Sequence, residues 1–252
     1  MIRRSPLTVV LAIALLAVLA IGGGGFWYLF LREAGPAAVG AASAAPGASG
    51  GVTLPAASCA PSSSGLTAGL DGTWTVDPSI GSFSDFSDSF VGYRVKEQLA
   101  GVGANTAVGR TPNVTGSLTL AGTSIADVLV TADLTTLQSD DSRRDGQLSH
   151  KGIATSSFPT ATFKLTAPIE LTAVPADCVV MTATATGDLT LHGVTKSVKV
   201  ALQAERSVGV VTVTGSTNIV FADYGFQGPS SFAVLSVEDH GVMEFQLHFR
   251  HA

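Results

Sequence analysis

Few residues in this sequence have the type and spacing that catalysis or metal binding needs. His248 and His251 come closest to a metal-binding pair, but side chains three residues apart on a β-strand point to opposite faces. The segment after residue 70 has no G-x-S-x-G elbow, no phosphate-binding glycine loop and no H-E-x-x-H pair. We therefore expect no metal site, no cofactor and no catalytic residue.

A cluster of charges within residues 139–153 is the other candidate for chemistry. Its aspartates and arginines could be mistaken for a general acid and base. On a short helix, charges three or four residues apart usually pair with one another on a solvated face, so we do not interpret them as catalytic. The cluster comprises Asp140, Asp141, Arg143, Arg144 and Asp145.

The elements that would position such residues are mostly β-strands. From Val179 to Leu191 every odd position is apolar or small and most even positions are polar, a period of two that is typical of a strand with one buried face. After His192-Gly193 the apolar positions become even, so two strands form a hairpin around a tight turn. The same alternation predicts further strands at 89–99, 115–121, 126–134, 160–170, 209–221 and 243–249.

About eight such strands in one domain predict an all-β fold, an antiparallel barrel rather than a sandwich. Residues 139–153 alone look helical, and such a helix could sit across a barrel end. The expected inward faces carry small residues such as Ala183, Ala185 and Gly187. These leave a hollow apolar interior if the barrel is round, or let two sheet faces approach closely if it is flattened, and residue type alone does not decide between them.

The hairpin segment at residues 187–198, read as G-x-L-T-x-x-G-V-T-K-x-V, resembles the signature of the YceI-like family of lipid-binding proteins. The resemblance spans about residues 71–252, and the family's other motifs follow in the family's order. They are Trp74-Thr75-Val76-Asp77-Pro78, Arg144-Asp145 with Leu148, Phe158-Pro159 with Phe163, and Asp223-Tyr224-Gly225.

The resemblance implies a lipocalin-like barrel whose elongated tunnel holds a long isoprenoid chain. It also implies that Arg144 and Asp145 are a structural pair that fixes the helix to the barrel. One position departs from the pattern, because Ser79-Ile80 stands where many relatives have His-Ser. Any role of that histidine does not transfer to this chain.

On this resemblance we expect a tunnel that binds an isoprenoid lipid of the quinone or polyprenol type. Apolar burial alone supplies the affinity, so the protein is expected to be a binding protein and not an enzyme. An enzyme acting on such a lipid and a tethered structural or interaction domain with a filled barrel are the two alternatives. The expected lining comprises Tyr93, Phe163, Met181, Ala183, Ala185, Phe221 and Phe245.

Glu97 has the same parity as Val91 and Tyr93, so it could point inward near a barrel mouth and meet a polar head group. The glycines at 101 and 103 favour a different interpretation, in which this strand frays before it reaches the mouth.

The N-terminal third predicts a membrane anchor and a tether. Residues 7–31 carry no charge and are long enough to span a bilayer, with Arg3 and Arg4 favouring a cytoplasmic N-terminus. We expect an uncleaved single-pass anchor at 1–33, a flexible Ala/Gly/Pro/Ser tether at 34–70 and an extracytoplasmic barrel at 71–252. The alternative is a secretory signal cleaved near Ala42-Ser43-Ala44.

Charge and cysteine content narrow the partners further. The chain has 14 Lys and Arg against 19 Asp and Glu and no basic cluster, which argues against nucleic acid. Cys59 in the tether and Cys178 before a strand are predicted to form a disulfide in an oxidising compartment, with two free thiols as the alternative. A homodimer is compatible with the sequence, which does not fix the oligomeric state.

Overall fold

The computed structural model describes residues 36–39, 69–229 and 234–252. The predicted anchor at 1–33 and most of the predicted tether lie outside this part of the chain. Within the described residues, no helix combines the length and apolar character needed to cross a membrane. The elements are β1 (Gly72–Val76), β2 (Phe90–Leu99), β3 (Gly103–Thr111), β4 (Val114–Ala121), β5 (Ser124–Asp133), η2 (Leu134–Thr136), β6 (Gln138–Ser139), α2 (Ser142–His150), β7 (Thr160–Leu165), β8 (Ile169–Glu170), β9 (Val180–Leu191), β10 (Val194–Ser207), β11 (Val210–Val220), η3 (Phe221–Tyr224), β12 (Val234–Val237) and β13 (His240–His251).

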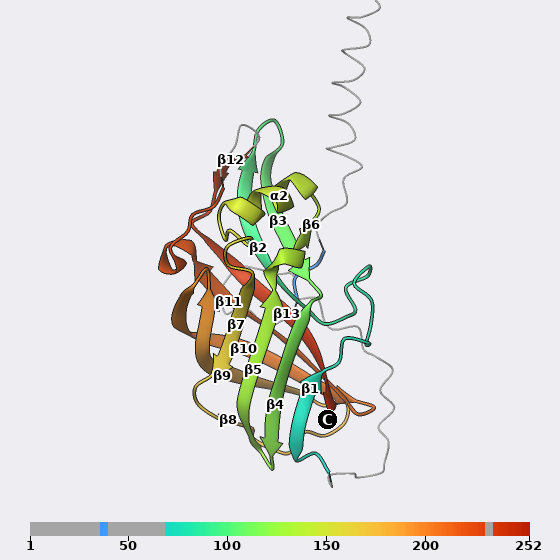
Figure 1. Cartoon of the computed structure of the whole chain (residues 1–252). Helices are drawn as coiled ribbons and strands as arrows, with labels where there is room; N and C mark the ends of the chain where they lie inside the picture. The colour runs from blue at the N-terminus through green and yellow to red at the C-terminus, as the bar shows by residue number, and fades with distance from the viewer. Residues whose placement is uncertain (1–35, 40–68, 230–233) are drawn as a thin grey trace, which may run out of the picture. The chain divides into compact units, whose positions relative to one another are not determined.

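The strands form one antiparallel sheet that closes into a barrel (Figure 1). Neighbours around the ring follow the order β1, β4, β5, β7, β9, β10, β11 and β13, and β1 then pairs with β13. The eight-stranded antiparallel barrel predicted from the alternation is therefore confirmed. The hairpin of β9 and β10 is its longest regular ladder, running from Val194 opposite Leu191 to Glu205 opposite Val180.

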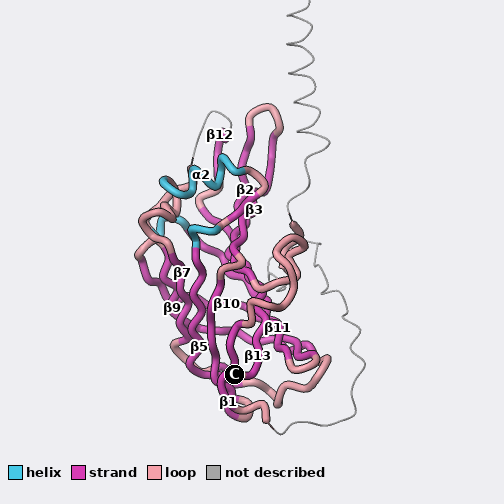
Figure 2. The backbone as a smooth tube through the Cα atoms, turned by 45° about the vertical axis from the view of Figure 1, so that its right-hand side comes forward, coloured by secondary structure: helices cyan, strands magenta, loops and turns pink. Residues whose placement is uncertain are grey.

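The long strand β13 changes neighbours along its length, and this gives the barrel two different ends. Its C-terminal residues pair with β1, whereas residues 242–246 pair with β2. From there β2 continues the sheet to β3 and β6, and α2 lies beside these strands at the end that also carries β12 (Figures 1 and 2). The predicted short helix at a barrel end is thus observed, and it begins after Asp141, whose side chain accepts a hydrogen bond from Arg143 N.

The strand predictions need three corrections. The segment 160–170 is two strands, β7 and β8, with Pro168 between them, where proline cannot donate to a ladder. The strand predicted at 209–221 ends at Val220, and Phe221 opens the 3-10 turn η3. Both β1 and β3 were missed: β1 has only five residues, and the last five residues of β3 are buried in succession, so its sequence shows no alternation.

Candidate ligand cavity

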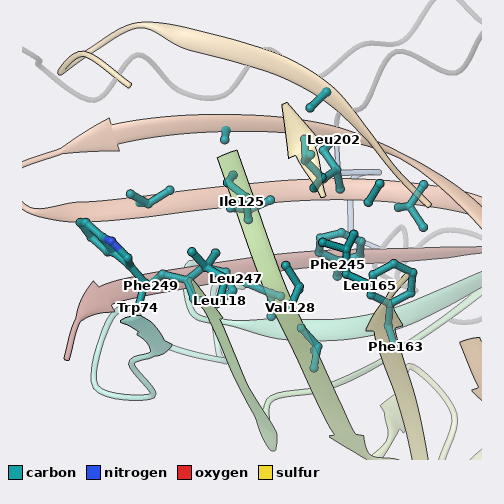
Figure 3. A pocket seen from close by; sticks show the side chains of 18 of the residues that line it. Trp74, Leu118, Ile125, Val128, Phe163, Leu165, Leu202, Phe245, Leu247 and Phe249 are labelled. Atoms are coloured by element: carbon teal, nitrogen blue, oxygen red, sulfur yellow. The ribbon is translucent and has the colours of Figure 1, made fainter. Parts of the chain in front are cut away.

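The barrel interior is hollow at the end that carries β1 and β8. A cavity of about 160 Å³ lies there. Its wall comes from all eight strands of the ring and is apolar apart from Thr162 and one charged rim. Figure 3 shows part of the apolar wall. A space of this size and character suits an apolar guest better than water, which needs polar partners.

Five of the seven residues that the sequence predicts as lining lie in the cavity wall. Phe163 and Phe245 come from β7 and β13, and the other three follow one another at alternate positions of β9. Because strand side chains alternate between faces, the parity read from the sequence accounts for their inward position, and their contact with a ligand stays a prediction. The five are Phe163, Met181, Ala183, Ala185 and Phe245.

Glycines keep the two aromatic rings from filling the cavity. A Cβ atom at Gly187 would lie 2.4 Å from Cζ of Phe163, and one at Gly215 would lie 2.5 Å from Cζ of Phe245. Each ring therefore rests against the strand backbone, in the place where a side chain would otherwise stand. The rings form part of the wall, and the space between opposite strands stays open.

Phe221, predicted to line the tunnel, lies outside the cavity wall. It packs with Leu189, Ile219 and Tyr224 in a second buried cluster and stacks on Phe226, with ring centroids 5.1 Å apart. Leu189 belongs to both this cluster and the cavity wall, so the cluster closes the cavity on the side away from β8. The prediction missed this because Phe221 no longer belongs to the strand whose parity was used.

Tyr93 also lies outside the cavity wall, although it has the inward parity of its strand. Its ring lies over Gly109, where a Cβ atom would be 2.4 Å from Cε1 of the tyrosine. Its buried hydroxyl has no hydrogen-bond partner among the residues that the structure describes. Burial raises the pKa of this hydroxyl, and Arg144 and Asp145 of α2 are among the nearby charges. Tyr93 therefore faces the helix end of the barrel and not the apolar cavity.

The charged residues of α2 fasten the helix to the sheet. Arg144 donates to Glu97 Oε1 of β2 at 2.7 Å and also bonds to Asp140, while Asp145 accepts from Ser139 Oγ of β6 at 2.6 Å. The structural role that the resemblance implied for Arg144 and Asp145 agrees with these contacts. The expectation that the strand frays at Glu97 is wrong, because β2 continues to Leu99 and the buried carboxylate is held by an ion pair.

The end of the cavity that lies away from α2 carries a polar rim, which the sequence prediction did not include. Arg206 lies in the cavity wall with its side chain 11% exposed, and its Nε lies 2.9 Å from Oδ1 of Asp177. The two form an ion pair, although among the described residues no group accepts a hydrogen bond in line with the buried Nε–H. Arg206 follows the even, inward positions of β10, so its parity was a signal that could have identified it.

The segment that leads into β9 covers this rim. Pro175, Val179 and the cavity side of Arg206 meet there, and Cys178 N donates to the carbonyl of Arg206 at 2.8 Å. Cys178 is disulfide-bonded. The partner expected from the sequence, Cys59, lies outside the described residues, so this pairing stays a prediction.

The two histidines with metal-like spacing make separate structural contacts. His248 is bonded to Thr212 Oγ1 and to the carbonyl of Ser87, each at 2.9 Å, and His251 is bonded to the carbonyl of Asp71. In the part of the chain that the structure describes, no three His, Cys, Asp or Glu side chains gather into a metal-binding group.

Comparison with known proteins agrees with this geometry. The model of the YceI-like domain matches residues 74–249. A polyisoprenoid-binding domain from Saccharophagus degradans has the same fold at 18% identity and a TM-score of 0.53, covering 71% of this chain and 98% of its own. BcnA from Burkholderia cenocepacia has 18% identity and a TM-score of 0.50, with 69% and 98% covered. No curated protein matches the chain significantly.

The contacts of α2 predict that replacing two adjacent arginines by alanine changes the free energy of unfolding by different amounts. Arg144→Ala leaves the carboxylate of Glu97, 4% exposed, without its cationic partner and with only the hydrogen bond from Asn105 Nδ2 among the contacts that the structure describes. This should lower the free energy of unfolding by about 2 to 4 kcal/mol. Arg143→Ala removes a side chain that is 87% exposed and should change it by less than about 0.5 kcal/mol. Denaturant unfolding of both variants measures the difference, and equal effects would contradict the anchoring role of Arg144.

Proposed function

Because this chain belongs to the YceI-like domain family, we propose that it is a binding protein that holds a long isoprenoid lipid, of the quinone or polyprenol type, in its barrel cavity. The observation that carries the proposal is the apolar cavity itself, with five predicted lining residues in its wall. The polyisoprenoid-binding neighbour of the same fold supports the choice of lipid.

Binding without catalysis fits the chemistry of the cavity wall. The charged residues in the wall are Glu205 and Arg206, both at one rim, and no other titratable side chain of the described residues lines the space. Burying an apolar chain contributes about 0.8 kcal/mol per methylene, so ten to twenty buried carbons offset the cost of association, which is on the order of 4 to 15 kcal/mol. Affinity then needs no catalytic or covalent contribution.

The head group of the lipid is expected at the Arg206 rim, with the apolar chain directed toward Phe163 and Leu189. Arg206 brings guanidinium N–H donors to this rim, and such donors suit a carbonyl or ether oxygen. The acidic side chains of Asp177 and Glu205 accompany it, so the rim has no excess positive charge for a phosphate. This favours an uncharged head group, such as a quinone, over a prenyl phosphate.

The anchor and the compartment complete the proposal. Residues 1–33 hold the protein in the membrane with the N-terminus in the cytoplasm, and the barrel lies outside the cytoplasm. The uncharged run of residues 7–31 supports the anchor. The disulfide at Cys178 supports an oxidising compartment, since disulfides rarely persist in the cytosol.

Occlusion of the cavity tests lipid binding. Ala185 is 3% exposed in the cavity wall, so Ala185→Phe should fill the space and abolish lipid that co-purifies, as seen by native mass spectrometry. Thr184→Phe adds the same ring to the exposed face of the same strand and should leave the lipid in place. After lipid removal, Ala185→Phe should cost less than about 1 kcal/mol of stability, whereas overpacking a filled core costs ~1 to 3 kcal/mol.

A large loss of stability in Ala185→Phe, together with a parent protein that never carries lipid, would mean that the barrel is a filled structural domain.

Head-group selectivity tests the role of Arg206. A prenylated benzoquinone should bind more tightly than a prenyl phosphate with the same chain length, measured by tryptophan fluorescence titration. Arg206→Ala should weaken quinone binding about tenfold, the effect of losing one hydrogen bond from a charged donor. Arg250→Ala removes an exposed arginine of β13 that pairs with Asp77, and it should change neither affinity. Tighter binding of the phosphate by the parent protein would exclude the proposed selectivity.

Protease treatment tests anchoring. Protease added to spheroplasts should release a soluble fragment that contains the barrel, and the remaining anchor should stay with the membrane. A mature protein in the soluble fraction that begins near Ala45 would instead show that the segment is a cleaved signal.

A further inference from the structure

A buried ion cluster lies on the outer face of the barrel, away from the cavity. Glu244 of β13 is 1% exposed, and its two carboxylate oxygens are held by different arginines. Arg94 Nε donates to Oε2 at 2.6 Å, and Arg110 Nη2 donates to Oε1 at 2.7 Å. One carboxylate thus meets two guanidinium groups, which leaves one positive charge and several donors for another partner.

The sheet register explains how the cluster forms. Gly92 of β2 lies opposite Glu244 on one side and opposite Arg110 on the other. Since Gly92 has no side chain, Arg110 crosses this position, where a Cβ atom would lie 2.7 Å from its Cγ. The rings of Phe86 and Phe90 hold the same guanidinium, with centroids 4.6 and 4.2 Å from Cζ of Arg110.

Residues 36–39 make three further hydrogen bonds to this cluster through their backbone. Arg94 Nη2 bonds to the carbonyl of Pro36, and Arg110 Nη2 donates to the carbonyl of Ala37 at 2.8 Å. In return, Val39 N donates to Oε2 of Glu244 at 3.3 Å. Figure 1 shows this short segment in blue. Every one of these contacts uses a main-chain atom, so the cluster recognises an extended peptide and not particular side chains.

We infer that the cluster of Arg94, Arg110 and Glu244 is a docking site for the chain's own residues 36–39, which holds the barrel close to the membrane. The inference rests on the anchor in the proposed function. From the last apolar residue, Leu31, to Pro36 are five chain steps, which span at most about 18 Å. Residues 40–70 come after the docked segment in the sequence, so their length does not add to the chain between the anchor and the docking site.

Docking shortens the distance that the chain allows between the anchor and the barrel. If residues 34–70 were free throughout, a flexible chain of this composition would place β1 at a root-mean-square distance of about 34 Å from the anchor, with excursions far beyond it. Docking at residues 36–39 limits the distance between the end of the anchor and the docking site on the barrel to the span of five residues. A barrel that exchanges lipid with a bilayer gains from such a short connection, because the barrel cannot diffuse far from the source of its ligand.

Distance measurements in the full chain test the docking itself. Nitroxide labels at Ala38→Cys, which is exposed, and at Lys96→Cys, whose side chain is 74% exposed, should give one narrow distance distribution by pulsed EPR in detergent. The double substitution Arg94→Ala/Val39→Pro removes two of the three backbone contacts and keeps the Arg110–Glu244 pair, so it should broaden the distribution severalfold. Arg94→Lys/Val39→Ala retains a charged donor and the amide, and it should stay narrow.

Circular dichroism of each variant confirms that the barrel remains folded. A broad distribution in the parent, or a narrow one that persists in Arg94→Ala/Val39→Pro, would overturn the docking site.

Energy transfer tests the consequence for the membrane. With the full chain in nanodiscs, a donor on Lys96→Cys and acceptor-labelled lipids, transfer efficiency should fall at least twofold in Arg94→Ala/Val39→Pro relative to Arg94→Lys/Val39→Ala. If transfer is unchanged in a variant that has lost docking, then docking does not set the distance between the barrel and the membrane. Neither measurement depends on a bound lipid, so failure of the lipid-binding function is seen separately by native mass spectrometry.

Discussion

Closure of the sheet by the five-residue strand β1 is the constraint on which the rest of this structure depends. Trp74 at its centre pairs with Leu118 of β4 on one side and with His251 of β13 on the other. Its indole Nε1 donates to the carbonyl of Leu70 at 2.9 Å, and its ring is a buried part of the cavity wall. Without β1, two strand edges would be unpaired and the apolar space would open sideways to water.

Once the ring is closed, the size of the space depends on where side-chain volume is placed. The interior holds large aromatic rings and still leaves a cavity, because Phe163 and Phe245 lie against Gly187 and Gly215. Small residues such as Ala185 line the wall between them. An eight-stranded barrel can either fill its centre or leave it open, and here the placement of these two rings against glycines helps to keep it open.

Polar groups are kept out of this space and are used at its margins. At one end Glu97 and Arg144 bind α2 to the sheet, and at the other Arg206 and Asp177 meet at the rim. The third polar group is the cluster around Glu244 on the outer face. In each of the three, an acidic side chain meets a basic one, as burial of charge requires. The cavity is thus lined mainly by apolar side chains, and the three groups of ion pairs lie at its ends or on the outer face of the barrel. Contacts specific to a partner are therefore confined to those places.

The sequence by itself determined which face of each long strand points inward, because side chains on a strand alternate with a period of two. For that reason alternation alone assigns Met181, Ala183 and Ala185 to the barrel interior, and the motif at 187–198 identifies the barrel family. Parity does not say how far along the barrel a residue lies. Only the tertiary structure decided that Tyr93 faces the helix end, that Phe221 leaves its strand, and that the five residues of β1 close the ring.

The ion cluster around Glu244 has no local pattern in the sequence. Its contacts with Arg94, Arg110 and residues 36–39 join positions that are 58 to 205 residues apart. Such contacts are fixed by strand register, which the whole sheet sets together and no single segment encodes.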